Sequence, residues 1–425
     1  MSNLKNEIML LSNAWYGDKP LQIYFPENWE VTVVGDSELT RLTDGQIQDK
    51  LNAPIGCNSL REKASTAQKA VILVDDLTRP TPCFKILPFV IKEIIDGGMP
   101  KEAIDVIISG GTHKPESKED MIKKVGREIY TSYRVTCHDS HKNLVKLGKT
   151  KRGTPLLLNR TVTQSDLKIG IGCIIPHPAA GFSGGAKLLI PGVCGAETVS
   201  FLHSYLKGCK LRGGSVETDF RSEIENAASI VGFDFSINAV INNRREIVGL
   251  FTGDMIRAFK EGVDFMNRYY RVPFVNDAEI VISDAYPEDV SLNLVRDRGL
   301  WPVFGRKKTV SNVVIAACSA GVGSHELFPV ADTLKHRLIQ RLKKFRLREF
   351  KNIRDKIKSI QNIINIRKTR FMLLSEGISE AELRSCFPDA ALYTRWEDTL
   401  EVLKRRHGAS KVKVALFQCS PLYFL

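Results

Sequence analysis

The stretch that decides the fold is KAVILVDDLTRPTP, residues 69–82. Its apolar run AVILV is continuous, which is typical of a strand buried on both faces of a parallel sheet. Two acids, Asp75 and Asp76, follow the run directly. The prolines of LTRPTP exclude regular structure, because proline lacks an amide hydrogen and restricts the residue before it. The stretch therefore predicts a buried parallel strand whose carboxyl end carries polar side chains.

The alternation of strand, loop and helix continues along the chain. Strands are predicted over 103–109 and 166–174, helices over 84–96, 117–125, 223–230 and 253–269, and a β-hairpin over 233–248. This pattern predicts an α/β fold with mainly parallel strands. Ligands of open parallel sheets bind beyond the carboxyl ends of the strands. Three of these ends bring Asp76 with Arg79, His113 and His177 toward one edge, which favours one shared site.

The length of 425 residues predicts about two domains. A boundary is expected near RVPFVND, residues 271–277, because a second set of strands follows at 279–284, 310–318, 371–374 and 412–417, with a helix over 396–406. We therefore expect an N-terminal domain over residues 1–270 and a C-terminal domain over 271–425, with the last strand able to return to the first domain.

The composition is that of a soluble globular protein, with 43% hydrophobic and 26% charged residues. No apolar run is long enough to span a bilayer, and residues 1–11 lack the pattern of a secretory signal, so we expect a cytoplasmic protein without membrane contact. The nine cysteines are odd in number and none has C-x-x-C spacing. This disfavours a disulfide framework and a cysteine zinc site.

Most of the net charge of +13 is concentrated in residues 331–370, where fourteen Lys and Arg face three acids, a balance of +11. Such a segment could bind nucleic acid. Its only aromatic residues are Phe345 and Phe350, so it offers no platform for stacking bases. We interpret it as a solvated helical arm or a surface for an anionic partner.

A second stretch, PHPAAGFSGGAKLLIPGVCGAETVSFLH at 176–203, contains three residues suited to chemistry. Lys187 lies in apolar surroundings, where a lysine is either snorkelling or desolvated and nucleophilic. A P-loop is excluded, because Ala186 precedes the lysine and LLIP cannot form the required helix. The glycine-rich backbone could still bind phosphate. His203 suits nickel, copper or zinc, or is a helix-surface histidine.

Histidine is also the side chain best suited to proton transfer at neutral pH. His113, in GGTHKP, and His177, between two prolines, lie in shaped loops. Each fits proton transfer and a purely structural role equally well. Arg79 could bind a carboxylate or phosphate through two hydrogen bonds, or form a local ion pair with Asp76.

Taken together, four motifs resemble the nickel-dependent lactate racemase family. They are DDLTRPTP (75–82), GGTHKP (110–115), DLKIGIGCIIPHPAAGFSGGAKLLIPGV (166–193) and DFSINAVIN (234–242). The resemblance covers most of residues 10–270. The spacings agree as well, with ten residues from His177 to Lys187 and sixteen from Lys187 to His203.

The resemblance implies two α/β domains with the active site in the cleft between them. It implies a nickel-pincer nucleotide attached covalently to Lys187, with Thr78, Gly184 and Gly185 also in the cofactor site. His203 would be a nickel ligand, and His113 and His177 would transfer protons. Asp76 and Arg79 would bind the substrate, a small 2-hydroxy acid. Proteins that synthesise the cofactor would be partners.

The chain departs from the family after Y-P-x-D. Lactate racemases of the family carry a glutamine and a lysine there, which hold the substrate carboxylate, whereas this chain has Leu294 and Asp297. Tyr286, Arg296 and Arg298 are then the candidates for substrate binding in the second domain. We expect a racemase or epimerase of a 2-hydroxy acid other than lactate. The alternatives are net oxidation or dehydration with the same cofactor, and a non-catalytic binding homologue. The sequence does not define the oligomeric state.

Overall fold

The computed structural model describes residues 4–35, 39–205, 214–323, 368–408 and 411–425. The chain divides into two compact units, which we call unit 1 (Met1–Ser37 with Tyr270–Leu425) and unit 2 (Glu38–Tyr269). Almost all of the basic segment 331–370 lies outside the described residues. Its interpretation as a helical arm therefore stays a prediction.

Unit 2 is built on a six-stranded sheet with the order β13-β12-β9-β4-β5-β6. Its strands are β4 (Ala70–Val74), β5 (Ile104–Ile108), β6 (Arg134–Cys137), β9 (Leu167–Cys173), β12 (Phe235–Ile241) and β13 (Ile247–Gly253). All neighbours pair in parallel except β12 and β13. Two small antiparallel pairs accompany the sheet: β7 (Leu144–Lys149) with β8 (Pro155–Asn159), and β10 (Pro176–His177) with β11 (Gly181–Phe182).

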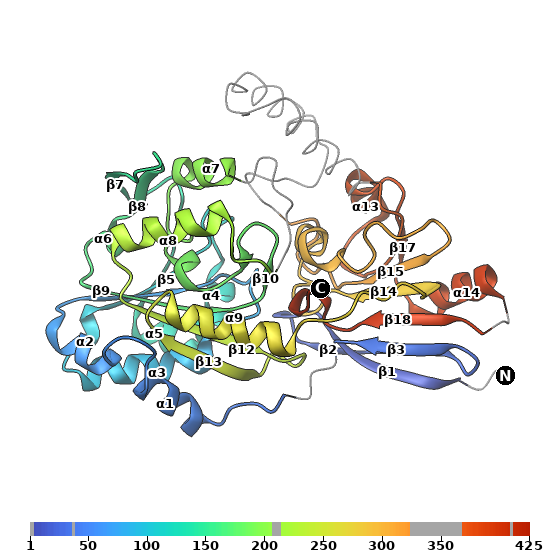
Figure 1. Ribbon diagram of the computed structural model, residues 1–425, viewed down its shortest axis with the longest axis horizontal. Helices are drawn as coiled ribbons and strands as arrows, with labels where there is room; N and C mark the ends of the chain where they lie inside the picture. The colour runs from blue at the N-terminus through green and yellow to red at the C-terminus, as the bar shows by residue number, and fades with distance from the viewer. Residues whose placement is uncertain (1–3, 36–38, 206–213, 324–367, 409–410) are drawn as a thin grey trace, which may run out of the picture. The chain divides into compact units, whose positions relative to one another are not determined.

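Helices cover both faces of this sheet (Figure 1). The first group is α1 (Asp44–Asn52), α2 (Leu60–Thr66), α3 (Cys83–Asp96), α4 (Lys118–Val125) and α5 (Arg127–Ser132). It encloses a core of Ile, Val and Leu side chains with the sheet. The other elements are α6 (Arg160–Thr163), η2 (Gly185–Leu188), α7 (Ala196–Ser204), α8 (Asp219–Val231) and α9 (Arg257–Tyr269). Of these, α9 packs on β12 and β13, and η2 packs on β9 and β12.

Unit 1 contains a second six-stranded sheet, with the order β17-β16-β15-β14-β18-β3 and parallel pairing throughout. Its strands are β3 (Glu30–Val34), β14 (Ile280–Asp284), β15 (Ser311–Ile315), β16 (Met372–Leu374), β17 (Ala391–Tyr393) and β18 (Lys413–Phe417). The hairpin β1 (Leu4–Ser12) with β2 (Lys19–Pro26) and the helix α14 (Trp396–His407) pack on one face. The other face is covered by α10 (Leu292–Leu294), η3 (Val295–Gly299) and α13 (Glu380–Cys386).

The α/β fold with mainly parallel sheets is confirmed, but residues 1–37 do not belong to an N-terminal domain over 1–270. They belong to unit 1, because β3 pairs in parallel with β18. The last strand, β18, lies between β14 and β3 in the sheet of unit 1. The division at Tyr270 falls beside the expected boundary.

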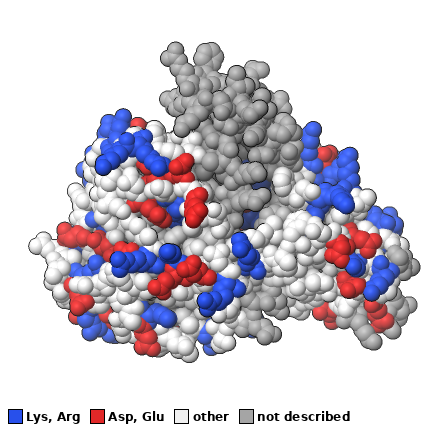
Figure 2. Space-filling view, viewed as in Figure 1, with Lys and Arg blue, Asp and Glu red and all other residues white. Residues whose placement is uncertain are grey.

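The described residues contain no helix that is long and apolar enough to cross a membrane. Outside 331–370 the sequence has 47 Lys and Arg against 45 Asp and Glu, from totals of 61 and 48, so its balance is +2. Figure 2 agrees with this balance, because blue and red side chains are interspersed over most of the described surface on the face shown. The basicity therefore belongs to one segment.

Candidate active site

Three neighbouring strands of unit 2 deliver the candidate residues to one edge of the sheet. β4 lies between β5 and β9, and Val74 is in register with Ile108 on one side and Ile171 on the other. Because all three strands are parallel, the loops that follow them leave from the same edge. We call residues 75–82 the β4 loop and residues 110–116 the β5 loop.

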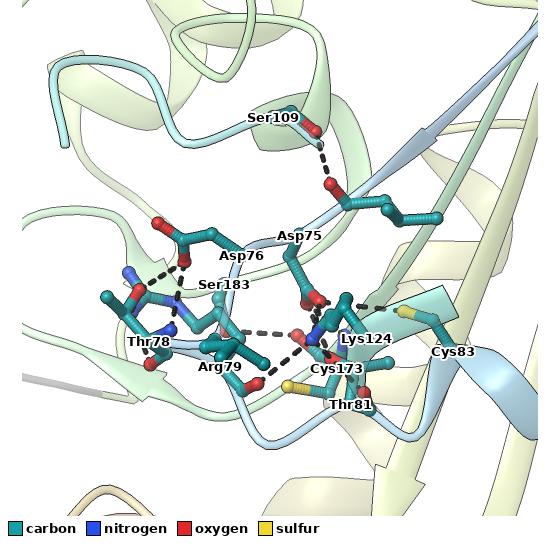
Figure 3. A network of polar contacts seen from close by, with 12 residues as sticks. Asp75, Asp76, Thr78, Arg79, Thr81, Cys83, Ser109, Lys124, Cys173 and Ser183 are labelled. Carbon is teal, nitrogen blue, oxygen red and sulfur yellow. Dashed lines mark hydrogen bonds and ion pairs between the residues drawn. The ribbon is translucent and has the colours of Figure 1, made fainter. Parts of the chain in front are cut away.

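A buried lysine of α4 holds the β4 loop through an ion pair and two hydrogen bonds. Lys124 is fully buried, and its Nζ lies 2.5 Å from Asp75 Oδ1. The same ammonium group donates to the carbonyls of Arg79 (3.0 Å) and Thr81 (3.1 Å) (Figure 3). Burial opposes the charge, but the Asp75 carboxylate raises the pKa of Lys124 above its usual value. The lysine therefore stays charged and holds an otherwise irregular loop.

Asp75 ties the β4 loop to its surroundings. Its Oδ2 accepts from the Thr81 hydroxyl at 2.5 Å and from the Cys173 amide of β9 at 3.4 Å. The Cys83 thiol, at the start of α3, lies 3.7 Å from Oδ1. A buried carboxylate with this many partners offsets its loss of hydration. Asp75 is therefore a structural residue, and Asp76 alone faces the candidate site residues.

Asp76 and His113 form a close pair that joins the β4 and β5 loops. The His113 Nδ1 lies 2.5 Å from Asp76 Oδ2, and the histidine side chain keeps 23% of its exposure. Burial would raise the pKa of Asp76, but the charges of His113 and Arg79 and a hydrogen bond from Thr78 hold it below its ordinary value. A carboxylate requires a donor, so His113 Nδ1 carries hydrogen and Nε2 is the basic atom.

Arg79 and Thr78 complete the β4 loop. The Thr78 hydroxyl donates to Asp76 Oδ1, and the Thr78 amide donates to the same oxygen at 3.1 Å. The Nη1 of Arg79 donates to the Thr78 carbonyl and to its hydroxyl oxygen, each at 2.9 Å. Arg79 is half-buried. Its guanidinium is therefore oriented by the loop itself, which suits a side chain that binds an anionic substrate group.

His177 lies in the small β10–β11 hairpin beyond the end of β9. Its backbone is in register with Gly181, and its Nδ1 accepts from the amides of Ala179 (3.1 Å) and Ala180 (3.2 Å). In the neutral ring the hydrogen must then be on Nε2. The hydrogen bonds thus favour opposite tautomers in the two neutral rings: Nε2 carries the lone pair in His113 and the hydrogen in His177.

Lys187 lies on a short 3₁₀ turn, η2, that follows a glycine pair. Gly184 and Gly185 have φ of +80° and +57°, a backbone region that other residues rarely adopt. The Asn238 side-chain oxygen accepts from the Gly185 amide at 2.8 Å and would lie 3.1 Å from a Cβ on Gly184. Lys187 itself is half-buried. The turn is not the long helix of a P-loop, as expected.

The loop before Lys187 is held by a buried arginine of α8. Arg221 donates to the carbonyls of Ala180 (3.2 Å), Phe182 and Gly184 (3.5 Å). Its guanidinium lies 4.2 Å from the centre of the Phe259 ring. Burial lowers the pKa of Arg221 to about 10, so it remains a cation at neutral pH. The sequence-based prediction did not include this residue.

His203 lies near the end of α7, where its Nδ1 is 2.7 Å from the Val199 carbonyl. The carbonyl requires Nδ1 to carry the hydrogen, so the lone pair is on Nε2. Burial lowers the pKa of His203 to about 4, and the charges of Lys187 and His113 contribute. The structure therefore brings His113, Lys187 and His203 close enough to affect one another, together with Asp76.

These residues fit the cofactor that the resemblance implies. A neutral imidazole with its lone pair on Nε2 is the state that ligates metals, and a lysine amine can form a covalent bond. In the described ranges no three His, Cys, Asp or Glu residues are grouped so that they could hold a metal ion. His203 would then be the residue that holds the metal, and Lys187 the residue that holds the cofactor.

The substrate candidates Tyr286, Arg296 and Arg298 all lie in unit 1, beyond β14. The Tyr286 hydroxyl donates to Asp18 at 3.2 Å. Arg298 is buried with Glu288, at 2.9 Å, and Arg296 lies 2.7 Å from Asp297. Their assignment to substrate binding stays a prediction, as does the position of the site between two domains.

Three charged residues that organise the site escaped the sequence-based prediction: Glu116, Lys124 and Arg221. For two of them, the spacing of apolar residues along the helix indicates a buried charged side chain. Lys124 shares a face with Met121 and lies beside buried Val125, and Arg221 shares a face with buried Ile224 and Ala228. A charged residue on the apolar face of a helix requires a buried partner. Glu116 follows a proline in a loop, and no such pattern points to it.

A fully buried histidine of unit 2, His138, gives a prediction for stability. Its Nε2 donates to the Cys194 carbonyl (2.9 Å), and burial lowers its pKa below 6.5. Below pH 6.5 the unfolded chain therefore binds a proton that the folded chain rejects. We expect the free energy of unfolding to fall by up to about 1.4 kcal/mol per pH unit as the pH drops from 6.5 toward the folded-state pKa.

The measurement is urea unfolding of unit 2, followed by hydrogen exchange, at several pH values. The variant His138→Gln keeps a donor for Cys194 and removes the titration, so its acid loss should be smaller than that of the wild type. The exposed residue His141 provides the control His141→Gln. Equal acid sensitivity of His138→Gln and the wild type would contradict the prediction.

Comparison with known proteins extends these observations. Residues 16–211 match the family model for the lactate racemase N-terminal domain. The chain is 31% identical to lactate racemase from Lactiplantibacillus plantarum over 253 aligned residues. The alignment covers 58% of this chain and 59% of that protein. It is 28% identical over 290 residues to lactate racemase from Thermoanaerobacterium thermosaccharolyticum, covering 66% and 67%. The alignment thus spans less than two thirds of the first of these relatives.

Solved structures share the fold. The lactate racemase apoprotein from Thermoanaerobacterium thermosaccharolyticum superposes with a TM-score of 0.75 at 20% identity, over 98% of this chain and 99% of that one. A crystal structure of a Thermotoga maritima protein gives 0.64 at 18% identity, over 90% and 98%. The chain is thus an α/β protein with the lactate racemase fold. In sequence, the similarity to lactate racemases covers residues 16–211 in the family model and 58–66% of the chain in the pairwise comparisons.

Proposed function

We propose that this protein is a racemase or epimerase of a 2-hydroxy acid. The observation that carries the proposal is the hydrogen bonding of two histidines, in which Nδ1 faces a carboxylate in His113 and two amides in His177. Inverting a carbon that bears a hydroxyl requires one group that takes the hydroxyl proton and another that returns a proton. The Nε2 of His113, held by Asp76, suits the first role, and the Nε2 of His177 suits the second when that ring is an imidazolium.

We propose further that Lys187 holds a nickel-pincer nucleotide covalently and that His203 ligates its nickel. When bound, this group supplies a carbon atom that accepts the α-hydrogen of the substrate as a hydride and returns it, as a nicotinamide would. The lowered pKa of His203 supports the assignment, because the imidazole stays neutral and able to ligate a metal at neutral pH. The arginine that fixes the loop before Lys187 supports it as well, since a tethering amine must be held in place.

The chain's own residues would then work as follows. Arg79, oriented by Thr78, binds a polar group of the substrate. His113 accepts the hydroxyl proton at Nε2, and the adjacent Asp76 carboxylate stabilises the imidazolium that forms. His177, once its ring has taken up a second proton from solvent, would give its Nε2 proton to the oxygen of the planar keto acid from the other side and return to the neutral form. In the reverse direction the two rings exchange roles after protons pass between each ring and the solvent.

The proposed substrate is a 2-hydroxy acid other than lactate. Leu294 is buried and apolar, and Asp297 is an anion that pairs with Arg296, so neither can bind a carboxylate. These are the two positions at which lactate racemases of the family are expected to hold the lactate carboxylate. Both arginines nearby are paired with a carboxylate, but the Arg298–Glu288 pair is buried, whereas the Arg296 side chain is 17% exposed, which makes Arg296 the better candidate for substrate binding.

The intact mass of the protein tests the cofactor assignment. Protein co-expressed with the cofactor-making enzymes should gain a covalent adduct and about one nickel per chain. Lys187→Ala should lose the adduct, and so should Lys187→Arg, which keeps the positive charge without a nucleophilic amine. The control Lys114→Ala removes an exposed lysine beside His113 and should retain the adduct. An unmodified wild-type mass under these conditions would refute the tether.

A further inference from the structure

Glu116 ends the β5 loop and contacts the β4 loop beside the Asp76–His113 pair. Its Oε1 accepts from the amide of Leu77 at 2.9 Å, and Leu77 directly follows Asp76. Each loop thus contributes a carboxylate to the other. Asp76 of the β4 loop binds His113 of the β5 loop, and Glu116 of the β5 loop binds the amide of Leu77, one residue after Asp76. We propose that Glu116 is a positioning residue that fixes His113 against Asp76 and sets the charge around this pair.

Glu116 and Lys124, at the two ends of the segment 116–124, together hold the β4 loop. Their contacts fall on alternate residues of that loop. Glu116 binds the amide of Leu77, and Lys124 binds the Asp75 carboxylate and the carbonyls of Arg79 and Thr81. The segment 116–124 therefore determines the path of the loop that carries Asp76 and Arg79. Asp76 thus lies between a residue held by Lys124 and a residue held by Glu116.

The position of Glu116 is itself fixed. Its own amide donates to the Cys137 thiol at 3.3 Å, at the end of β6, the strand next to β5. Ser117, the next residue, caps α4 by accepting from the Asp120 amide at 3.2 Å. Glu116 is thus held between a strand end and a helix start. The backbone from which its carboxyl group reaches Leu77 is therefore fixed at both sides.

The surroundings make Glu116 an ionisable group at neutral pH. Burial and the negative charge of Asp76 raise its pKa to about 7, Asp120 adds to this, and Lys124 and the Leu77 amide oppose it. Glu116 is therefore largely neutral below pH 7 and negative above it. Above neutral pH, an additional negative charge therefore lies beside the Asp76–His113 pair.

This inference rests on the proposed function only where it concerns turnover, so the experiment has an arm in the apoprotein. The carboxyl carbon of Glu116 is followed by ¹³C NMR across pH 5–9 in isotope-labelled protein, and Glu116→Gln identifies its signal. In the wild type the signal should titrate near pH 7. In Asp76→Asn the midpoint should move to lower pH, because the charge that raises it is gone. An unchanged midpoint in Asp76→Asn would overturn the coupling.

The second arm uses the loaded enzyme. Glu116→Ala removes the contact with Leu77 and should lower kcat by roughly 10- to 100-fold, the cost of misplacing a catalytic group. Glu116→Gln keeps an acceptor for Leu77 and should restore most of kcat, while losing the step in the pH profile near 7. Glu119→Gln, on the exposed first turn of α4, is the control and should behave as the wild type. If Glu116→Gln keeps the pH step, or if Glu116→Ala equals the control, the positioning role is refuted.

The two arms separate the possible failures. If the wild type shows no racemisation, the proposed function fails, while the NMR titration still decides whether Glu116 is coupled to Asp76. If racemisation occurs and the titration is insensitive to Asp76, the inference fails alone.

Discussion

Replacing Lys124 with alanine should lower the free energy of unfolding of unit 2 by about 3–5 kcal/mol, because it leaves a buried carboxylate without its partner. The ammonium group contacts Asp75 at 2.5 Å and two carbonyls of the β4 loop, and nothing in alanine replaces these contacts. The loop that carries Asp76 and Arg79 should loosen with it.

The positions of the tryptophans allow the unfolding of the two units to be measured separately. All four tryptophans, at positions 15, 29, 301 and 396, lie in unit 1. Their fluorescence therefore reports unfolding of unit 1 and should change little in Lys124→Ala. Hydrogen exchange of the β4 and β5 amides reports unit 2 and should accelerate. The control Lys123→Ala removes a half-buried pair with Asp120 and should cost no more than about 1 kcal/mol.

A double variant separates charge from packing. Lys124→Met combined with Asp75→Asn removes both charges and keeps much of the volume, so it should be more stable than Lys124→Met alone. Protection of β4 in Lys124→Ala equal to that in Lys123→Ala would show that the buried pair does not hold the loop.

His113→Ala should lower racemisation by the loaded enzyme by about 10²- to 10⁴-fold, the usual contribution of a general base. His177→Ala should have an effect of the same order. For a pair of enantiomers the equilibrium constant is one, so each variant must lower kcat/KM equally in the two directions. A panel of single-enantiomer 2-hydroxy acids, followed by chiral chromatography, measures both rates.

The control for the histidine variants is His141→Ala, which removes an exposed histidine of the same unit. It should retain wild-type rates. Asp76→Asn should resemble His113→Ala, because an amide in place of the carboxylate no longer stabilises the imidazolium. Turnover that survives in both His113→Ala and His177→Ala would refute the two proton-transfer roles. Accumulation of a keto acid would show that the net reaction is oxidation, and accumulation of an alkene would show that it is dehydration.

The sequence predicted well what depends on local pattern. The continuous run AVILV became β4, and the helix predicted over 84–96 became α3. The hairpin predicted over 233–248 appeared as β12 and β13. These features follow from the apolar period and from turn residues, which are encoded within a few positions. The close pair of Asp76 and His113 follows from the same logic, since adjacent parallel strands bring their end loops together.

What the sequence did not predict depends on pairing between distant segments. The run EVTVV at 30–34 has no feature that assigns it to a strand more than 380 residues away, yet it pairs with β18. Likewise, Glu116 meets Leu77 across 39 residues. The tautomers of His113 and His177 depend on which neighbours reach Nδ1, a carboxylate in one case and two amides in the other. Such contacts exist only once the fold has formed.

The pairing of β3 with β18 also bears on the order in which the chain folds during synthesis. Unit 2 is one uninterrupted segment inserted between the two parts of unit 1, so all of its strands are available once residue 269 has left the ribosome. The sheet of unit 1 must wait for residues 413–417, because β18 joins β14 to β3. Closing that loop has a high entropic cost, which early folding of unit 2 reduces by bringing its two ends to fixed positions. Unit 2, which contains Lys187 and the two histidines of the proposed mechanism, would thus fold well before the unit that carries the substrate candidates.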